Sequence, residues 1–145
     1  MLKMFDGMKT FRKEYKVITE RKEQALDITA NVTEALRESG IAEGLCVVNS
    51  LHTSSGVIIT DSDIFLNEDM SGILAGIVSE KNAYRHDDND FKKNASAHLK
   101  AMIMGLGVTI PISFSKLDLG TYQTVYYLEY DGKREKSFMV KCCGE

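Results

Sequence analysis

The sequence has little of several features that mark large classes of protein. Its 145 residues include one proline, no tryptophan and three cysteines, and no CxxC pair occurs. An odd number of unpaired cysteines is typical of a reducing cytoplasm, so Cys46, Cys142 and Cys143 are interpreted as structural thiols. Without Pro-rich, repetitive or low-complexity stretches, residues 1–145 are predicted to form a single domain.

The chain also lacks an excess of positive charge and lacks long apolar runs. It carries 18 Lys and Arg against 21 Asp and Glu, a net charge of -3. This balance argues against a nucleic-acid or anionic-membrane partner. No apolar run approaches the roughly 18 residues of a membrane span. The opening MLKMFDGMK has no continuous apolar core of a signal peptide, so a cytoplasmic protein is expected.

Alternation and capping residues predict the first elements. Apolar and charged residues alternate over 10–19, which predicts a half-buried strand, and a second strand is expected over 23–28. Thr29 is placed to cap a helix with Val32, Ala35 and Leu36 on one face, and Gly40 to end it.

The strongest helix signal covers residues 67–81. Apolar residues recur there at i, i+3, i+4, i+7 and i+8, which predicts a stripe facing the core. The stripe consists of Met70, Ile73, Leu74, Ile77 and Val78. Another helix is expected to begin at Asn94 as its N-cap and to end near Met104, before Gly105.

The remaining apolar segments predict strands. They cover residues 45–51, 57–59, 108–114, 120–130 and 133–142. The pair Asp131-Gly132 predicts a two-residue β-hairpin between the last two. Because strands do not alternate regularly with helices, the order indicates an α+β fold with mostly antiparallel sheets and about three helices.

Three histidines stand where distant segments can converge. His52 follows a strand at the turn HTSSG, His86 lies in an acidic loop, and His98 lies one helical turn after Asn94. Three imidazoles with an open fourth position would make a zinc-type catalytic site. No local signature such as HExxH is present, so separate surface or core histidines are the alternative.

A possible anion site lies at the start of the helix expected from Asn94. Lys92 and Lys93 come before NASA, whose small side chains, including Ala95 and Ser96, leave helix N-terminal N–H groups approachable. Such a helix start favours phosphate or carboxylate. The hydroxyls of Thr53 and Ser54 offer further donors. The alternative is a plain N-cap with solvated lysines.

Acidic and amide side chains complete the candidates. Asp61 and the acids around His86 could orient an imidazole or act as a base, although Asp88 and Asp90 also fit solvated loop charges. Gln123 and Glu129 share parity on one strand-like segment. That segment equally fits a core strand with its polar residues facing outward.

Four ordered motifs carry a family resemblance. They are HTSSGVIITD at 52–61, YRHDD at 84–88, NASAHLKAMIMG at 94–105 and LGTYQTVYYLEYDGKR at 119–134. Together they resemble the YjbQ-like family, whose members are often labelled secondary thiamine-phosphate synthase. The resemblance runs through nearly the whole chain.

The resemblance implies an α+β homotrimer with sites near subunit boundaries. It also implies that His52, His86 and His98 are the family's site histidines, with Asn94 and Gln123 among its recurring polar residues. The implied activity is a transferase reaction that joins a pyrimidine methyl diphosphate to a thiazole phosphate and releases diphosphate. A divalent metal such as zinc or magnesium could assist that departure.

Some positions depart from the family pattern. Ser54 and Ser55 stand where the family usually has TA in HTTAG, and Asp61 stands where Glu is common. Tyr122 replaces the usual Trp, and Lys133 the usual Pro. The shorter Asp61 puts a direct catalytic role for that residue in doubt, whereas no histidine is lost.

The residues together with this resemblance predict a small-molecule enzyme acting on a phosphorylated substrate, and the resemblance implies a secondary thiamine-phosphate synthase activity. Its predicted catalytic and metal-binding residues are His52, His86 and His98, supported by Asn94 and Gln123. The predicted substrate-binding residues are Thr53, Ser54, Lys93, Ala95 and Ser96. The alternatives are a metal-assisted hydrolase and a non-catalytic metal- or anion-binding regulatory module.

Overall fold

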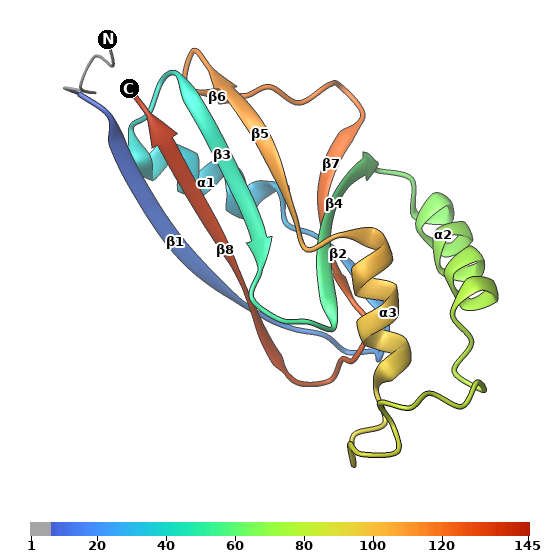
Figure 1. The fold of residues 1–145 in the computed structure, drawn as a ribbon. Helices are drawn as coiled ribbons and strands as arrows, with labels where there is room; N and C mark the ends of the chain where they lie inside the picture. Colours follow the sequence, from blue (N-terminus) through green and yellow to red (C-terminus); the bar gives the residue numbers. More distant parts are fainter. Residues whose placement is uncertain (1–6) are drawn as a thin grey trace, which may run out of the picture.

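The computed structural model describes residues 7–145, so part of the segment used to argue against a signal peptide lies outside it. The described residues form two antiparallel sheets and three helices (Figure 1). One sheet has five strands in the order β1-β8-β3-β5-β6, and the other has three in the order β2-β7-β4. The predicted α+β class is confirmed. No helix in this part of the chain is long and apolar enough to cross a membrane.

The elements follow the predicted order. The strands are β1 Lys9–Ile18, β2 Gln24–Asp27, β3 Gly44–Ser50, β4 Ser55–Asp61, β5 Gly107–Ser113, β6 Lys116–Leu117, β7 Gln123–Glu129 and β8 Glu135–Gly144. The helices are α1 Thr29–Ser39, α2 Ile64–Ile77 and α3 Ala95–Met104.

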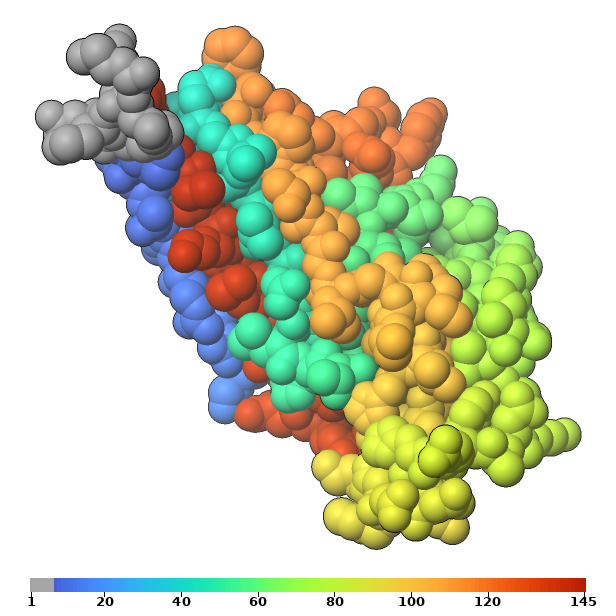
Figure 2. Space-filling view, in the orientation of Figure 1, coloured from blue at the N-terminus to red at the C-terminus, as the bar shows by residue number. Residues whose placement is uncertain are grey.

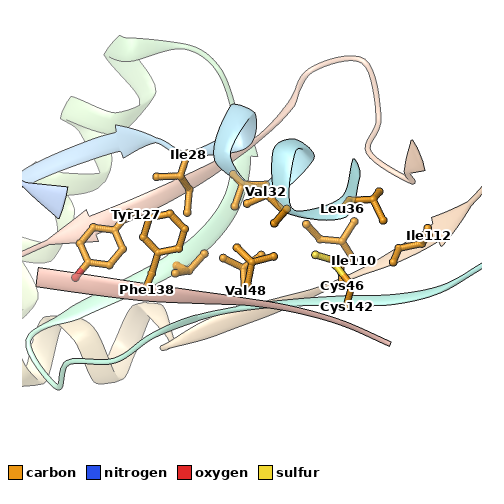
Figure 3. Close-up of a cluster of buried hydrophobic side chains, with 14 of the residues drawn as sticks. Ile28, Val32, Leu36, Cys46, Val48, Ile110, Ile112, Tyr127, Phe138 and Cys142 are labelled. Atoms are coloured by element: carbon orange, nitrogen blue, oxygen red, sulfur yellow. The ribbon is translucent and has the colours of Figure 1, made fainter. Parts of the chain in front are cut away.

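The main core lies between the two sheets and α1. Val32 of α1 lies over Val48 of β3, and Leu36 lies over Cys46 of β3 and Ile110 of β5, as Figure 3 shows. A second, smaller cluster covers the other face of the three-stranded sheet, where Leu128 packs with residues of α2 and α3. Because that sheet is covered on both faces, β7 is a nearly continuous apolar run rather than an alternating one.

Helix α2 corrects the prediction of a helix over 67–81. It begins three residues earlier, where the Asp63 carboxylate accepts a hydrogen bond from the N–H of Phe65 at 2.9 Å. Of the predicted core-facing stripe, Leu74 is the one residue buried within the helix, whereas Ile73 is 65% exposed and Ile77 63% exposed. Met70 is partly buried and Val78, just after the helix, is buried, so two of the five residues of the predicted stripe face solvent.

The Asp131-Gly132 turn corrects the predicted β-hairpin. Strand β7 pairs with β2 and β4, while β8 pairs with β1 and β3, so the turn carries the chain from one sheet to the other. The N–H of Gly132 donates to the carbonyl of Lys22 at 2.9 Å.

The start of α1 differs from its prediction as well. Ile28 occupies the N-cap position, and Thr29 is the first helical residue. The Asp27 carboxylate accepts from the N–H of Thr29 at 2.9 Å, and the Thr29 hydroxyl accepts from the N–H of Val125 at 3.0 Å. Thr29 therefore ties the helix to β7 instead of capping it, whereas Gly40 ends the helix in the left-handed conformation, as predicted.

Candidate functional site

Three connections meet at one end of the molecule and enclose a pocket. They are the β3–β4 turn, the segment entering α3, and the β7–β8 turn (Figure 1). Figure 2 shows residues 80–95 at this same end, beside the other two connections. The pocket has a volume of about 290 Å³. Five predicted site residues line it: His52, Thr53, Ser54, Asn94 and His98.

His52 is held with a defined tautomer. Its Nε2 accepts a hydrogen bond from the N–H of Ser137 at 3.0 Å, so in the neutral ring the hydrogen is on Nδ1. Burial, followed by the charge of Lys136, lowers the pKa of His52 below its ordinary value. His52 is therefore a neutral imidazole in the pocket wall at pH 7.

His98 lies between two hydrogen-bond acceptors. Its Nδ1 is 3.0 Å from the carbonyl oxygen of Thr53, and its Nε2 is 3.2 Å from Oδ1 of Asn94. The amide of Asn94 is oriented because its Nδ2 donates to the Asp131 carboxylate at 2.9 Å. The ring can therefore donate to one neighbour when neutral and to both when doubly protonated.

His86 stacks on His98 but does not line the pocket. The two rings stack with centroids 5.1 Å apart, and Nε2 of His86 is 3.9 Å from the Asp90 carboxylate. The structure thus places the three predicted histidines at one end of the molecule, with His52 and His98 on the pocket wall and His86 behind His98.

The predicted three-histidine metal site does not fit this arrangement. The Nε2 lone pair of His52 already accepts from Ser137, and both nitrogens of His98 face acceptors. Within residues 7–145 no group of three or more His, Cys, Asp or Glu is placed to hold a metal ion. The chemistry of the pocket is therefore derived from its side chains alone.

The predicted anion site at the start of α3 is already filled by a carboxylate. Asp87 accepts from the N–H of Ala95 at 3.0 Å. Ala95 and Ser96 are buried, and Lys93 is exposed and does not line the pocket. The acidic loop thus folds back over the helix start, and Asp87 accepts the N–H group of Ala95 that the anion site was predicted to offer. Lys92 does line the pocket.

Gln123 is not brought to the pocket by this chain. It begins β7, opposite Asp61, and its side-chain oxygen accepts from the N–H of Gly120 at 2.8 Å. Glu129 ends the same strand, six residues away, a span of about 20 Å in an extended strand. Shared parity put the two residues on one face, whereas only one end of the strand reaches the site.

A buried ion pair beneath the pocket was missed by the sequence analysis. Lys136 Nζ donates to the Ser54 hydroxyl at 2.8 Å and to Oε1 of Glu129 at 3.1 Å. The same oxygen accepts from the N–H groups of Tyr130 and Asp131 at 3.0 and 2.9 Å. The available signal was an acidic residue at the end of one strand and a lysine near the start of the next, on either side of the Asp-Gly turn.

A hydroxyl network supports the turn that carries His52. Tyr127 donates to the Ser55 hydroxyl at 2.7 Å, and the hydroxyls of Ser55 and Ser50 are 2.8 Å apart. Ser50 in turn accepts from the N–H of His52 at 3.2 Å. Burial raises the pKa of Tyr127, which keeps its hydroxyl a donor. The HTSSG turn is thus fixed by buried side chains from β3, β4 and β7.

Comparison with known proteins places this arrangement in one family. A curated UPF0047 protein of Methanothermobacter thermautotrophicus is 33% identical over 138 residues, 95% of each chain. Another, from Archaeoglobus fulgidus, is 34% identical over 123 residues, 85% of this chain and 94% of the relative.

Solved structures agree with the sequence comparison. A YbjQ-like protein of unknown function from Sulfolobus solfataricus superposes with a TM-score of 0.92 at 29% identity, covering 96% of this chain and 100% of the other. A YjbQ/UPF0047 protein of Clostridium acetobutylicum superposes with a TM-score of 0.84 at 35% identity, covering 90% and 98%. The family model for UPF0047 protein YjbQ-like matches residues 13–145, and the chain belongs to this family.

Proposed function

We propose that the pocket is the active site of an enzyme that acts on a small phosphorylated molecule. The observation that carries the proposal is the convergence of Lys92, Arg134 and Lys136 with the imidazoles of His52 and His98 around one cavity, which three carboxylates also line. Cations and N–H donors stabilise phosphate oxygens, and a neutral imidazole transfers protons near pH 7.

The size of the pocket bears on the reaction. At about 290 Å³ it lies at the lower limit of ligand pockets, which start near ~300 Å³. This volume is enough for one small phosphorylated molecule within a single chain. We propose thiamine-phosphate synthesis, which joins a pyrimidine diphosphate to a thiazole phosphate, as a secondary activity because the family resemblance implies it.

Turnover by histidine variants tests the proposal. Purified protein is supplied with the pyrimidine methyl diphosphate and thiazole phosphate, and diphosphate release is measured for wild type and for His52→Ala and His98→Ala. We expect each variant to lose at least about 100-fold, as for removal of a general acid or base. Wild-type rates in both variants would contradict the assignment of these residues.

The alternatives give different results in the same experiment. A hydrolase releases diphosphate without the thiazole phosphate, and a regulatory module binds the phosphorylated compound without turnover. A metal-assisted reaction is tested by measuring the metal content of the purified wild-type protein and of His52→Ala, His86→Ala and His98→Ala. A metal content that falls in all three substituted proteins would support a shared metal site, although the single chain does not place the three rings around one ion.

We further propose that the chain assembles as a homotrimer, as the family resemblance implies. The support is the number of exposed large apolar side chains on α2, of which Leu66, Ile73 and Ile77 share one face of the helix. The exposed side chains are Ile64, Phe65, Leu66, Ile73 and Ile77.

A further inference from the structure

The hydrogen bonds around Lys136 leave two donors without acceptors. A lysine ammonium carries three hydrogens, and two of them go to Ser54 Oγ at 2.8 Å and Glu129 Oε1 at 3.1 Å. Within residues 7–145 the third has no acceptor. Because the Ser54 hydroxyl accepts from Lys136, its own hydrogen is free as well, and it too lacks an acceptor in this part of the chain.

Both groups are buried yet line the pocket. Ser54 and Lys136 are each 5% exposed. Burying a donor without an acceptor costs about 1–3 kcal/mol, and more when the donor is charged. Two such donors on residues that line one cavity therefore favour a ligand that supplies acceptor oxygens.

The surrounding contacts fix the two donors before any ligand arrives. The Glu129 carboxylate accepts from two backbone N–H groups, which fix its position, and it also accepts from Lys136 Nζ. The carbonyl of Ser54 accepts from the N–H of Tyr130 at 3.2 Å, which anchors the turn. Donors that are already oriented bind without a further loss of side-chain freedom.

We propose that Ser54 and Lys136 form the phosphate-binding floor of this pocket. One phosphate or diphosphate oxygen of the ligand accepts from the Ser54 hydroxyl and from the remaining N–H of Lys136. This inference rests on the proposed function, and it places the anion on the β7–β8 side of the pocket instead of at the start of α3.

The charge around the floor is consistent with this ligand class. Glu129 compensates the charge of Lys136, and Asp131 lies 3.2 Å from Arg134. Lys92 makes no ion pair within the described residues, and the carboxylates of Asp90 and Glu135 line the same pocket. The three cations of the lining are thus matched by three carboxylates, and the preference for phosphate rests on the two donors, which suit an oxygen on which negative charge increases as it leaves.

Calorimetric titration with inorganic diphosphate tests the floor directly. Ser54→Ala removes one donor but keeps the Lys136–Glu129 pair, so we expect a fold like wild type and binding weaker by about 10-fold or more. Lys93→Met is the matched control, because that lysine is exposed outside the pocket, and it should bind like wild type.

Removing the lysine needs a paired change. Lys136→Met alone would leave the Glu129 carboxylate buried without its partner and could prevent folding. The double variant Lys136→Met with Glu129→Gln removes both charges together, and its folding is checked by circular dichroism. We expect it to lose diphosphate binding at concentrations that saturate wild type.

The outcomes separate the floor from the proposed function. If Ser54→Ala or the folded double variant binds diphosphate with wild-type affinity, the proposed phosphate-binding floor is wrong. The proposed enzyme activity is then still tested independently by the turnover assay. Loss of binding in Lys93→Met overturns the floor and returns the anion site to the start of α3. If wild type binds no diphosphate, the floor is overturned even where turnover of another substrate is found.

Discussion

At the scale of single residues, the hydrogen bond of His52 to Ser137 depends on the protonation state of the imidazole. Its Nε2 can accept from the Ser137 N–H only while the ring is neutral at that nitrogen. Protonation would place two donors face to face in a partly buried setting beside Lys136. The same contact that fixes the tautomer for chemistry therefore makes the native state sensitive to acid.

We predict that His52 contributes a pH dependence to stability. Its pKa in the folded chain lies below the ordinary value of 6.5, so the unfolded chain takes up a proton at higher pH than the native chain does. The native state should be fully favoured above about pH 6.5 and should lose stability as the pH falls from there through the lowered pKa.

Urea unfolding of wild type and His52→Gln between pH 8 and pH 5 measures this contribution. Glutamine can still accept from Ser137 but does not titrate, so the variant should lose less stability on acidification than wild type does. Equal losses in the two proteins would contradict a role for His52 in the acid sensitivity.

The three thiols are predicted to differ in reactivity. Cys46 and Cys142 are fully buried, and burial raises the pKa of both thiols, which removes the reactive thiolate. Cys143 is partly exposed. A thiol reagent should therefore react rapidly with one cysteine in the native protein and with all three after unfolding. Fast labelling that persists in Cys143→Ser would show that the buried pair is accessible.

Residue chemistry explains which site residues could be predicted. His52, Ser54, Asn94 and His98 stand beside turns or helix starts, where local pattern shows that a side chain can reach a cavity. Lys136 escaped notice because its importance comes from burial against Glu129, a contact between strands of different sheets. Partners of this kind are fixed by tertiary packing, which local pattern does not report.

At the scale of elements, Gly56 allows the start of β4, beside the His52 turn, to approach the end of α3 closely. A Cβ at Gly56 would clash with the carbonyl oxygen of Gly105, which accepts from the N–H of Val57 at 3.3 Å. We predict that Gly56→Ala destabilises the protein by about 1–3 kcal/mol, because either β4 or the end of α3 must move.

A second glycine provides the matched control in the same urea-unfolding measurement. Gly72 lies in α2 with open space around its Cα, so Gly72→Ala should be neutral or stabilise by up to ~1 kcal/mol. If Gly56→Ala behaved like Gly72→Ala, the close approach of β4 to α3 would not limit stability.

Periodicity located the elements better than it located their faces. Alternation in β1 correctly put Tyr15 and Val17 toward the core, because one face of that edge strand is covered by α1 and its neighbours. In α2 the stripe of Ile73 and Ile77 was expected to face this chain's own core, but the two side chains are exposed. An apolar period shows which side chains share a helix face, and it does not show whether the chain's own core covers that face.

At the scale of the whole molecule, the exposed face of α2 is the strongest argument for assembly. The compact part of the chain has its core between two sheets and α1, while α2 lies at one side of the molecule with little of its surface covered (Figure 1). Exposed apolar side chains gathered on one helix face, as Leu66, Ile73 and Ile77 are, commonly mark a surface that a partner covers. A second copy of the chain is the partner that the proposed homotrimer supplies.

We predict that Ile73→Lys combined with Ile77→Lys converts the assembly to monomers. Light scattering after size exclusion should give three times the 16.2 kDa of one chain for wild type and one chain's mass for the variant. The matched control is Ile18→Lys, an equally exposed isoleucine on β1, 71% exposed, which should remain assembled. Because Leu74 is left in place, the inner contact of α2 should survive and the monomer should stay folded. A wild-type protein that is monomeric at micromolar concentration, or a variant that still assembles, would contradict both the trimer and the use of α2 as its interface.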